Sequence, residues 1–284
     1  MLRLIVMLAA VMSASPAWAK PAVWVVRDAD SEMVLFGSVH VLPEGLDWRP
    51  AGLTRALERA QDVWFELPPG PETEAESARL AAERGRLAPG RRLSDLIEPR
   101  LYARLMTAAA RYGLAPPMLD QMEPWLADVA LAGAVFRAAG AQAAEGVEKQ
   151  LAEAAPQARL RAFETPAEQI GFFDGAAIAD QIGSLEESVA EVETDPDAYR
   201  RLVDAWLSGD PAAIERQALE PLRKSAPGLY RTVVVRRNAA WVERLDARLK
   251  GAGATVVIVG AGHLVGPDSL PARLRALGYS VEGP

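Results

Sequence analysis

The chain has 284 residues, half of them apolar, with 31 Lys and Arg against 38 Asp and Glu and no cysteine. The lack of cysteine excludes disulfides, thiolate metal ligands, cysteine nucleophiles and a lipid-modified cysteine. The net charge of -7, without any run of basic residues, argues against nucleic acid and anionic membrane surfaces as partners.

The first nineteen residues have the pattern of a signal peptide. Arg3 precedes an apolar stretch from Leu4 to Met12, and Ala17-Trp18-Ala19 is a small-x-small cleavage site. The apolar stretch is too short to span a bilayer, and no later segment has about 18 uninterrupted apolar residues. We therefore expect cleavage after Ala19 and a periplasmic or secreted domain over residues 20–284, with no stable membrane anchor.

Six runs rich in β-branched and aliphatic residues predict strands. The first two are joined by the turn-rich segment RDADS, which predicts a hairpin. In chain order the runs are AVWVV (22–26), EMVLFGSVH (32–40), DVWFELP (62–68), RLRAFE (159–164), ATVVIVG (254–260) and YSVE (279–282). We expect all of them in one sheet.

Helical patterns fill the middle of the chain. Most of residues 71–158 and 165–250 has apolar residues at three- and four-residue spacing, which indicates helices. Breaks are expected at Pro68-Pro69-Gly70-Pro71, Pro116-Pro117 and Asp195-Pro196-Asp197. The pattern predicts an α/β fold whose central sheet is built from N- and C-terminal strands, with a large helical insertion over roughly residues 71–250.

Both histidines of the chain stand in the same local pattern. His40 and His263 each follow a strand-like run and lie three residues after a glycine, Gly37 and Gly260. Open α/β sheets hold ligands at such strand ends, because side chains can converge there in a crevice. Glycine permits a sharp exit from the strand and a close approach of the backbone to a substrate. We expect both glycines to border a binding site.

Two glutamates occupy similar positions. Glu66 ends a strand-like run before a rigid Pro-Pro-Gly loop, and Glu164 ends another. Two imidazoles with one or two carboxylates match the donor set that zinc or a similar divalent ion accepts. Each histidine has an alternative interpretation as a hydrogen-bonded residue at the edge of the core. For Glu164 the alternative is an acid at a helix N-terminus, where Thr165 would be the cap and Glu168 its capping-box partner.

The sequence suggests two other kinds of site less strongly, a dinucleotide site and a serine hydrolase site. The segment VVIVGAGHLVG has glycines at 260, 262 and 266 and resembles a dinucleotide fingerprint, with Glu282 as a ribose acid. However, Pro267 delays the next helix, and we expect no further βαβ unit after it. A serine hydrolase is disfavoured because the chain has no G-x-S-x-G motif, and Ser38 would point away from His40 on an extended strand.

Taken together, these motifs resemble the TraB/GumN family, which is related to the Tiki proteins and more distantly to erythromycin esterases. The resemblance covers nearly the whole mature chain. Two G-x-x-H corners with a glutamate between them are the hallmark of the family. The matching segments are LFGSVHVLPEG, VWFELP, EGVEKQL, AFETPAEQIGFF, RRNAAWVERL and VVIVGAGHLVGPDSLPARLRALGYSV.

The resemblance implies an α/β fold of the Tiki and erythromycin esterase type and a divalent metal ion, either Mn, Zn or Co, held by His40, Glu66 and His263. Arg237 and Asn238 match a further family motif. A guanidinium there would hold a substrate carboxylate or a developing oxyanion; the alternative for Arg237 is a surface position beside Arg236.

The family's FET element adds support for Glu164 as a site residue.

The leading hypothesis is an exported metal-dependent hydrolase acting on a peptide or small-molecule substrate at a peptide or ester bond. The metal would polarise the scissile carbonyl and activate water, while Glu66 would ligate the metal or act as base. The alternative is a non-catalytic periplasmic protein that binds haem, a metal or a peptide through the same corners. A third hypothesis is a purely structural periplasmic partner.

Overall fold

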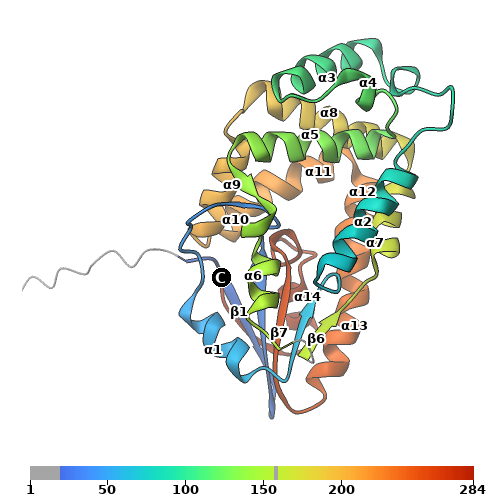
Figure 1. Ribbon diagram of the computed structural model, residues 1–284. Helices are drawn as coiled ribbons and strands as arrows, with labels where there is room; N and C mark the ends of the chain where they lie inside the picture. Colours follow the sequence, from blue (N-terminus) through green and yellow to red (C-terminus); the bar gives the residue numbers. More distant parts are fainter. Residues whose placement is uncertain (1–19, 157–158) are drawn as a thin grey trace, which may run out of the picture.

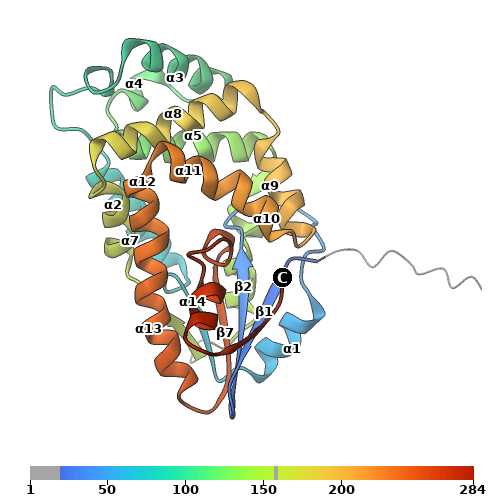
Figure 2. The same ribbon diagram turned by 180° about the vertical axis from the view of Figure 1, so that it is seen from behind.

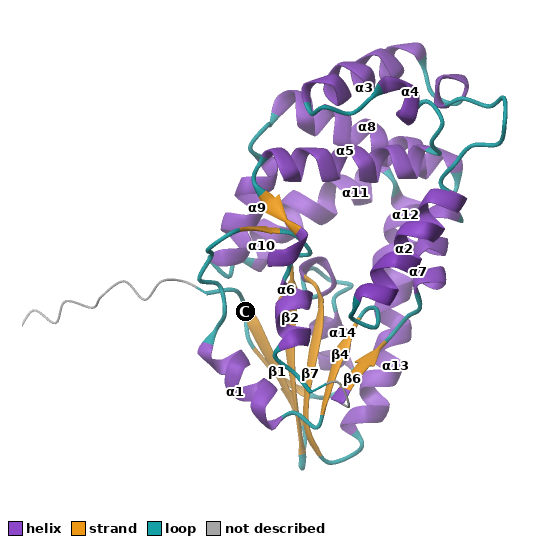
Figure 3. Cartoon of the chain, in the orientation of Figure 1, coloured by secondary structure: helices purple, strands orange, loops and turns teal. Residues whose placement is uncertain are grey.

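The computed structural model describes residues 20–156 and 159–284. The predicted signal peptide, residues 1–19, lies outside the described residues. The fold is mixed α/β, as predicted, with strands gathered in one central sheet and helices around and beyond it (Figures 1 and 3).

All six predicted strands lie in this sheet. Its order is β6-β4-β7-β2-β1-β8. The β1–β2 pair is the predicted antiparallel hairpin, β2, β7, β4 and β6 run parallel, and β8 is antiparallel to β1. The bounds are β1 Val23–Arg27, β2 Ser31–Ser38, β4 Asp62–Phe65, β6 Leu160–Ala162, β7 Gly253–Gly260 and β8 Ser280–Glu282.

The central strands are covered on both faces. Leu35 and Phe36 of β2 and Val257 and Ile258 of β7 have no exposed surface. Strands buried on both faces require nearly continuous apolar sequence rather than alternation, and β2 and β7 have it. Their continuous runs are the reason that the sequence predicts these two strands well.

A second, two-stranded sheet was not predicted. It pairs β3 (Leu42–Pro43) with β5 (Ala141–Gln142) in antiparallel register. Strands of two residues carry no periodicity, so the sequence gives no signal for them. The pair ties the loop after β2 to the helical part of the chain.

Many helices begin with proline at their first position, where the missing N–H is not needed and the fixed φ suits a helix. This holds for seven of the α-helices within the described residues, α2, α3, α4, α5, α7, α10 and α12. The α-helices are α1 Ala51–Arg59, α2 Pro71–Arg84, α3 Pro99–Arg111, α4 Pro116–Leu119, α5 Pro124–Ala138, α6 Val147–Glu153, α7 Pro166–Asp174, α8 Ile178–Thr194, α9 Ala198–Leu207, α10 Pro211–Ile214, α11 Glu220–Ser225, α12 Pro227–Tyr230, α13 Arg237–Leu249 and α14 Leu270–Ala276. Short 3-10 helices are η1 Leu93–Asp95, η2 Ala143–Glu145 and η6 Ala261–His263, and π-helical turns are η4 Glu215–Leu219 and η5 Arg231–Arg236.

Within the insertion, α3, α4, α5, α8 and α11 form a layer beyond the carboxyl ends of β2 and β7 (Figures 1 and 2). There α3, α5 and α8 have a buried apolar cluster of their own, with Leu105, Leu131 and Leu185 fully buried. The main core joins the sheet to α1, α6, α9 and α13. The strand ends, where the sequence predicts a site, therefore face the helical layer.

Within residues 20–156 and 159–284, no helix is both long and apolar enough to cross a membrane.

Candidate functional site

The two G-x-x-H corners lie side by side. Strands β2 and β7 are parallel neighbours, and Ser38 is paired in register with Gly260. Gly37 makes this close approach possible, since a Cβ placed on it would lie 2.9 Å from Cα of Ala261. The two corners, whose histidines are 223 positions apart (263 minus 40), thus meet at one edge of the sheet.

Three of the predicted site residues surround Gly260. A Cβ placed on this glycine would lie 3.2 Å from Oε1 of Glu66, 3.7 Å from Cδ2 of His263 and 3.9 Å from Nε2 of His40. The Gly260 N–H donates to Oε1 of Glu66 at 2.7 Å. The absence of a side chain at Gly260 leaves space between an imidazole, a carboxylate and the backbone.

Glu66 and Glu164 are neighbours across the sheet. Their strands, β4 and β6, are parallel, and the Glu164 N–H donates to the Glu66 carbonyl at 2.9 Å. Both side chains are buried, and both accept from Arg237 Nη2, at 2.6 Å to Glu66 Oε2 and 2.8 Å to Glu164 Oε2. Buried carboxylates need such a partner, and the guanidinium supplies it.

Every N–H of the Arg237 guanidinium has a partner. Besides the two bonds from Nη2, Nε donates to Glu164 Oε1 at 2.8 Å, and Nη1 donates to the Val233 carbonyl and contacts His263 Nε2, both at 3.2 Å. The ring of Trp241 lies 4.7 Å from Arg237 Cζ. Arg237 is buried rather than at the surface, and in this arrangement it holds the site together with no donor left for a substrate.

A π-helical turn precedes this arginine. Turn η5 ends at Arg236, and the wider turn leaves the Val233 carbonyl able to accept from the Arg237 side chain. Helix α13 then presents Arg237, Asn238 and Trp241 on one face. Trp241 Nε1 donates to Glu164 Oε1 at 2.9 Å.

His263 is held by Asn238 and Arg237. The Asn238 Nδ2 donates to the carbonyls of His263 and Asp268, so its Oδ1 faces His263 Nδ1 at 2.7 Å. Burial is the largest cause that lowers the pKa of His263; Glu66 opposes it, the charges of Arg237 and His40 add to it, and together these effects bring the pKa to about 4. The ring is therefore neutral at pH 7.

Glu66 is ionised. Burial raises the pKa of its carboxyl, but the positive charge of Arg237 and the imidazoles of His263 and His40 outweigh that effect and bring the pKa to about 2. Gln169 of α7 also donates to Glu66 Oε2, at 3.2 Å.

His40 differs from His263 in exposure and charge. Its side chain is 70% exposed, and its Nδ1 contacts Glu148 Oε1 at 2.6 Å. The Glu148 carboxylate, with a smaller effect of Glu66, outweighs desolvation and raises the pKa of His40 to about 9. At neutral pH the ring is an imidazolium whose Nε2 lies near Gly260.

The segment after β6 contains both the predicted helix cap and a site residue. Thr165 is the N-cap of α7 and forms a capping box with Glu168. Glu164 itself is not part of the cap, because its carboxylate is bound by Arg237 and Trp241. Burial, the largest effect, raises the pKa of Glu164.

These residues do not fit a divalent metal ion as they are placed. Among the described residues no group of three or more His, Cys, Asp or Glu side chains could hold one. The physical reason is the arginine: the Nε2 lone pair of His263 faces Arg237, and Glu66 is paired with the same guanidinium. An imidazolium at His40 also has no lone pair for a metal. The metal site stays a prediction that requires these groups to rearrange.

Sequence reasoning missed three residues of this cluster, Glu148, Gln169 and Trp241. Each stands in a segment that carries the family resemblance, but none ends a strand. Trp241 follows Arg237 by four residues, a helical spacing that would have placed it on the same face.

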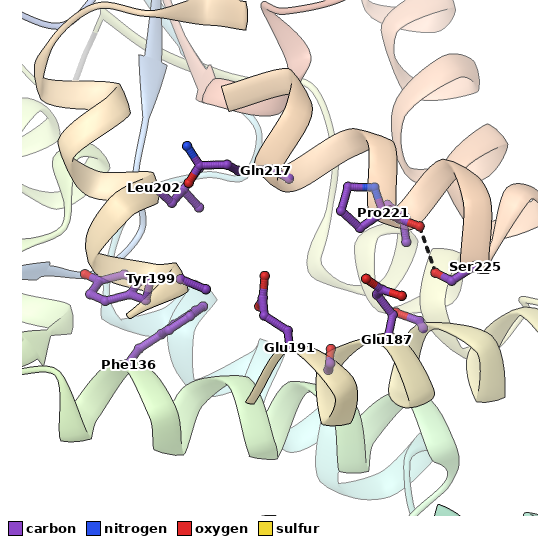
Figure 4. Close-up of a pocket in the computed structure, with 13 residues that line it drawn as sticks. Phe136, Glu187, Glu191, Tyr199, Leu202, Gln217, Pro221 and Ser225 are labelled. Carbon is purple, nitrogen blue, oxygen red and sulfur yellow. Dashed lines mark hydrogen bonds between the residues drawn. The ribbon is translucent and has the colours of Figure 1, made fainter. Parts of the chain in front are cut away.

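A separate cavity of about 230 Å³ lies in the helical insertion. Figure 4 shows Glu187 and Glu191 of α8 across from Gln217 and Pro221. None of the predicted site residues lines it; the lining residues are Phe136, Ser184, Glu187, Ser188, Glu191, Ala198, Tyr199, Leu202, Gln217, Ala218, Pro221, Leu222 and Ser225. The sheet edge, not this cavity, carries the converging polar groups.

Comparison with known proteins identifies the family of the chain. The model of the TraB/PrgY/gumN family matches residues 22–283. The chain is similar to the uncharacterized protein YbaP of Escherichia coli, with 22% identity over 90% of this chain and 92% of the relative, and equally to YbaP of Shigella flexneri. An uncharacterized protein of Treponema pallidum is 27% identical over 54% of this chain and 49% of its own length. No solved structure matches.

Proposed function

The chain belongs to the TraB/PrgY/gumN family, and on that premise we propose that it hydrolyses an ester or amide bond of a peptide or small molecule beside Gly260, with His40 as acid and Glu66 as base. One observation carries the proposal. His40 Nε2 and Glu66 Oε1 face the same position, within 3.9 and 3.2 Å of a Cβ placed on Gly260. An acid and a base flank one point in space.

The protonation states suit these roles. The pKa of His40 is raised to about 9 by Glu148, and the pKa of Glu66 is lowered to about 2 because Arg237 outweighs its desolvation. At neutral pH the imidazole holds a proton to give and the Glu66 carboxylate is unprotonated. Environments that drive two pKa values apart in this way are typical of acid–base pairs.

The reaction would proceed by attack of water on the scissile carbonyl carbon. Glu66 accepts a proton from the water as its oxygen bonds to carbon, and His40 Nε2 donates a proton to the leaving oxygen or nitrogen. The C–O or C–N bond breaks, and the acid product and the alcohol or amine leave. The proton on Glu66 then returns to His40 through solvent.

Arg237 supports the base rather than the substrate in this scheme. Its guanidinium fixes Glu66 Oε2 at 2.6 Å, which leaves Oε1 toward Gly260. Glu164, His263 and the Val233 carbonyl occupy the remaining donors of Arg237 and so fix its position. Such support restricts the catalytic carboxylate to one orientation.

A metal-dependent form of the same hydrolysis is the competing hypothesis. It would require His40 to lose its proton and Arg237 to leave His263, after which His40, Glu66 and His263 become a possible ligand set for Mn, Zn or Co.

Export to the periplasm, or secretion after cleavage behind Ala19, is part of the proposal. Mass spectrometry tests it, and an intact Met1 on the exported chain would refute that part.

The experiment is a screen of ester and peptide libraries with the purified mature chain. The wild type is compared with His40→Asn and Glu66→Gln, and with Glu153→Gln, an exposed glutamate of α6, as control. Turnover by the wild type and the control, with loss of roughly 100-fold or more in both site variants, supports the proposal. No turnover of any ester or peptide, together with a haem band or peptide binding, would favour the non-catalytic alternative.

A further inference from the structure

His40 is joined to a carboxylate that takes no proton in the proposed reaction. Glu148, in the first turn of α6, lies 2.6 Å from His40 Nδ1 through its Oε1. The hydroxyl of Ser38 donates to the same oxygen at 2.6 Å. The side chains of Ser38, Glu148 and His40 form one hydrogen-bonded chain, although Ser38 and Glu148 are 110 residues apart in the sequence.

We propose that Glu148, oriented by Ser38, is a positioning residue that fixes the ring of His40 so that Nδ1 donates to the carboxylate and Nε2 faces Gly260. The inference rests on the proposed function only for its effect on rate. A base or acid held by a third group is a recurring arrangement in catalytic sites, because the second ring nitrogen then has a fixed direction.

The backbone supports this role. The Val147 N–H donates to the Val39 carbonyl at 3.1 Å, which docks the start of α6 against the segment that carries His40. Gly146 is required at this contact, since a Cβ placed on it would lie 2.2 Å from the His40 carbonyl oxygen. Backbone contacts therefore hold the helix start and the histidine together, in addition to the side-chain contact.

The competing interpretation is a surface ion pair of little consequence. Exposed pairs contribute only about 0–1 kcal/mol and are often mobile. Glu148 differs from such partners because only 23% of its side chain is exposed and a second donor, Ser38, fixes the oxygen that His40 contacts. The charged groups around the His40 ring are Glu148 from α6, Glu66 from β4 and Arg237 from α13. Of these, Glu148 is the one in direct contact with Nδ1.

Nuclear magnetic resonance of the histidine ring nitrogens tests the geometry without any substrate. The mature chain has only two histidines, and the His40→Asn variant assigns their signals. We expect a hydrogen-bonded Nδ1–H signal for His40 in the wild type, in Glu153→Gln and in a weaker form in Ser38→Ala. We expect a weakened signal in Glu148→Gln, because an amide oxygen still accepts, and its loss in Glu148→Ala. Persistence of the full signal in both Glu148 variants would overturn the inference.

Kinetics provide the second measurement once a substrate is known. Glu148→Gln should lower kcat by roughly 10- to 100-fold with KM within about twofold, as expected for a residue that orients a catalytic group. Ser38→Ala should have a smaller effect of about 2- to 10-fold in the same direction. Glu153→Gln should match the wild type. An unchanged kcat in folded Glu148→Gln would overturn the positioning role, whereas loss of all turnover in the wild type would refute only the proposed hydrolysis.

Discussion

Arg237 and His263 are joined by a 3.2 Å contact between Nη1 and Nε2, which assigns the protons of the imidazole. Arginine has only donors, so Nε2 must be the acceptor and the proton lies on Nδ1, which donates to Asn238 Oδ1. Asn238 is oriented for this by two bonds from its Nδ2 to backbone carbonyls. Arg237 thus selects the tautomer of His263, while burial is the main reason that the ring stays neutral.

The first prediction concerns acid stability. The folded-state pKa of His263, about 4, lies below its ordinary value of 6.5, so the unfolded chain binds this proton more readily. The free energy of unfolding contributed by His263 is fully present above pH 6.5 and is lost as the pH falls toward 4, by roughly 3 kcal/mol in all. Urea unfolding between pH 7 and 4.5 measures it. In His263→Gln the slope over this range should shrink, and an identical slope would contradict the assignment.

The second prediction concerns the buried ion cluster. Arg237→Met should lower the free energy of unfolding by about 3–5 kcal/mol, because it leaves the Glu66 and Glu164 carboxylates without their shared cation. Arg104→Met is the matched control. Its partner, Glu193, is at the surface, and the expected loss is below about 1 kcal/mol. Equal losses in the two variants, measured by urea unfolding, would show that the buried cluster is not stabilised by Arg237.

The third prediction concerns the meeting of the two corners. Gly37→Ala should destabilise the chain by about 1–3 kcal/mol, since the new Cβ would lie 2.9 Å from backbone Cα of Ala261. Gly52→Ala, in α1 with no atom within 4 Å of the new Cβ, should be neutral or stabilising by up to about 1 kcal/mol. Thermal unfolding of both variants provides the comparison. A harmless Gly37→Ala would mean that the corners do not approach as closely as described.

Features of the fold that depend on local sequence could be predicted, whereas features that depend on packing between distant segments could not. Strands β2 and β7 were predictable because continuous apolar runs mark strands buried on both faces, and shorter runs between turn-rich segments marked the other four. The convergence of His40, Glu66 and His263 near Gly260 also agrees with the strand-end argument. These features depend on sequence local to each strand and on one general rule for open sheets.

The ion pairs of the site and the protonation of its histidines could not be predicted from local sequence. Arg237 lies between Glu66 and His263 because α13 packs against two strand ends. No local sequence pattern encodes that packing. Glu148 lies on α6, and only the docking of that helix on the His40 backbone places it beside the ring. Long-range packing, rather than residue type, separates an imidazolium at His40 from a neutral ring at His263.

The fourth prediction concerns His40. Because its side chain is 70% exposed and its one close charged contact is Glu148, His40→Asn should lower the free energy of unfolding by only about 1–2 kcal/mol while it removes turnover by roughly 100-fold or more. Differential scanning calorimetry and initial rates on one preparation measure both quantities. A much larger loss of stability would identify His40 as a structural residue, and unchanged turnover would remove it from the reaction.

The most direct test of the central claim is the pH dependence of hydrolysis by chelator-treated protein. With His40 as acid and Glu66 as base, the wild type should retain its full rate after removal of divalent ions, and kcat/KM should stay level from about pH 6 to 8 and fall as the pH rises through about 9, the pKa of His40. A rate that is abolished by the chelator and restored by Mn or Zn would contradict this account and establish a metal-dependent site at His40, Glu66 and His263.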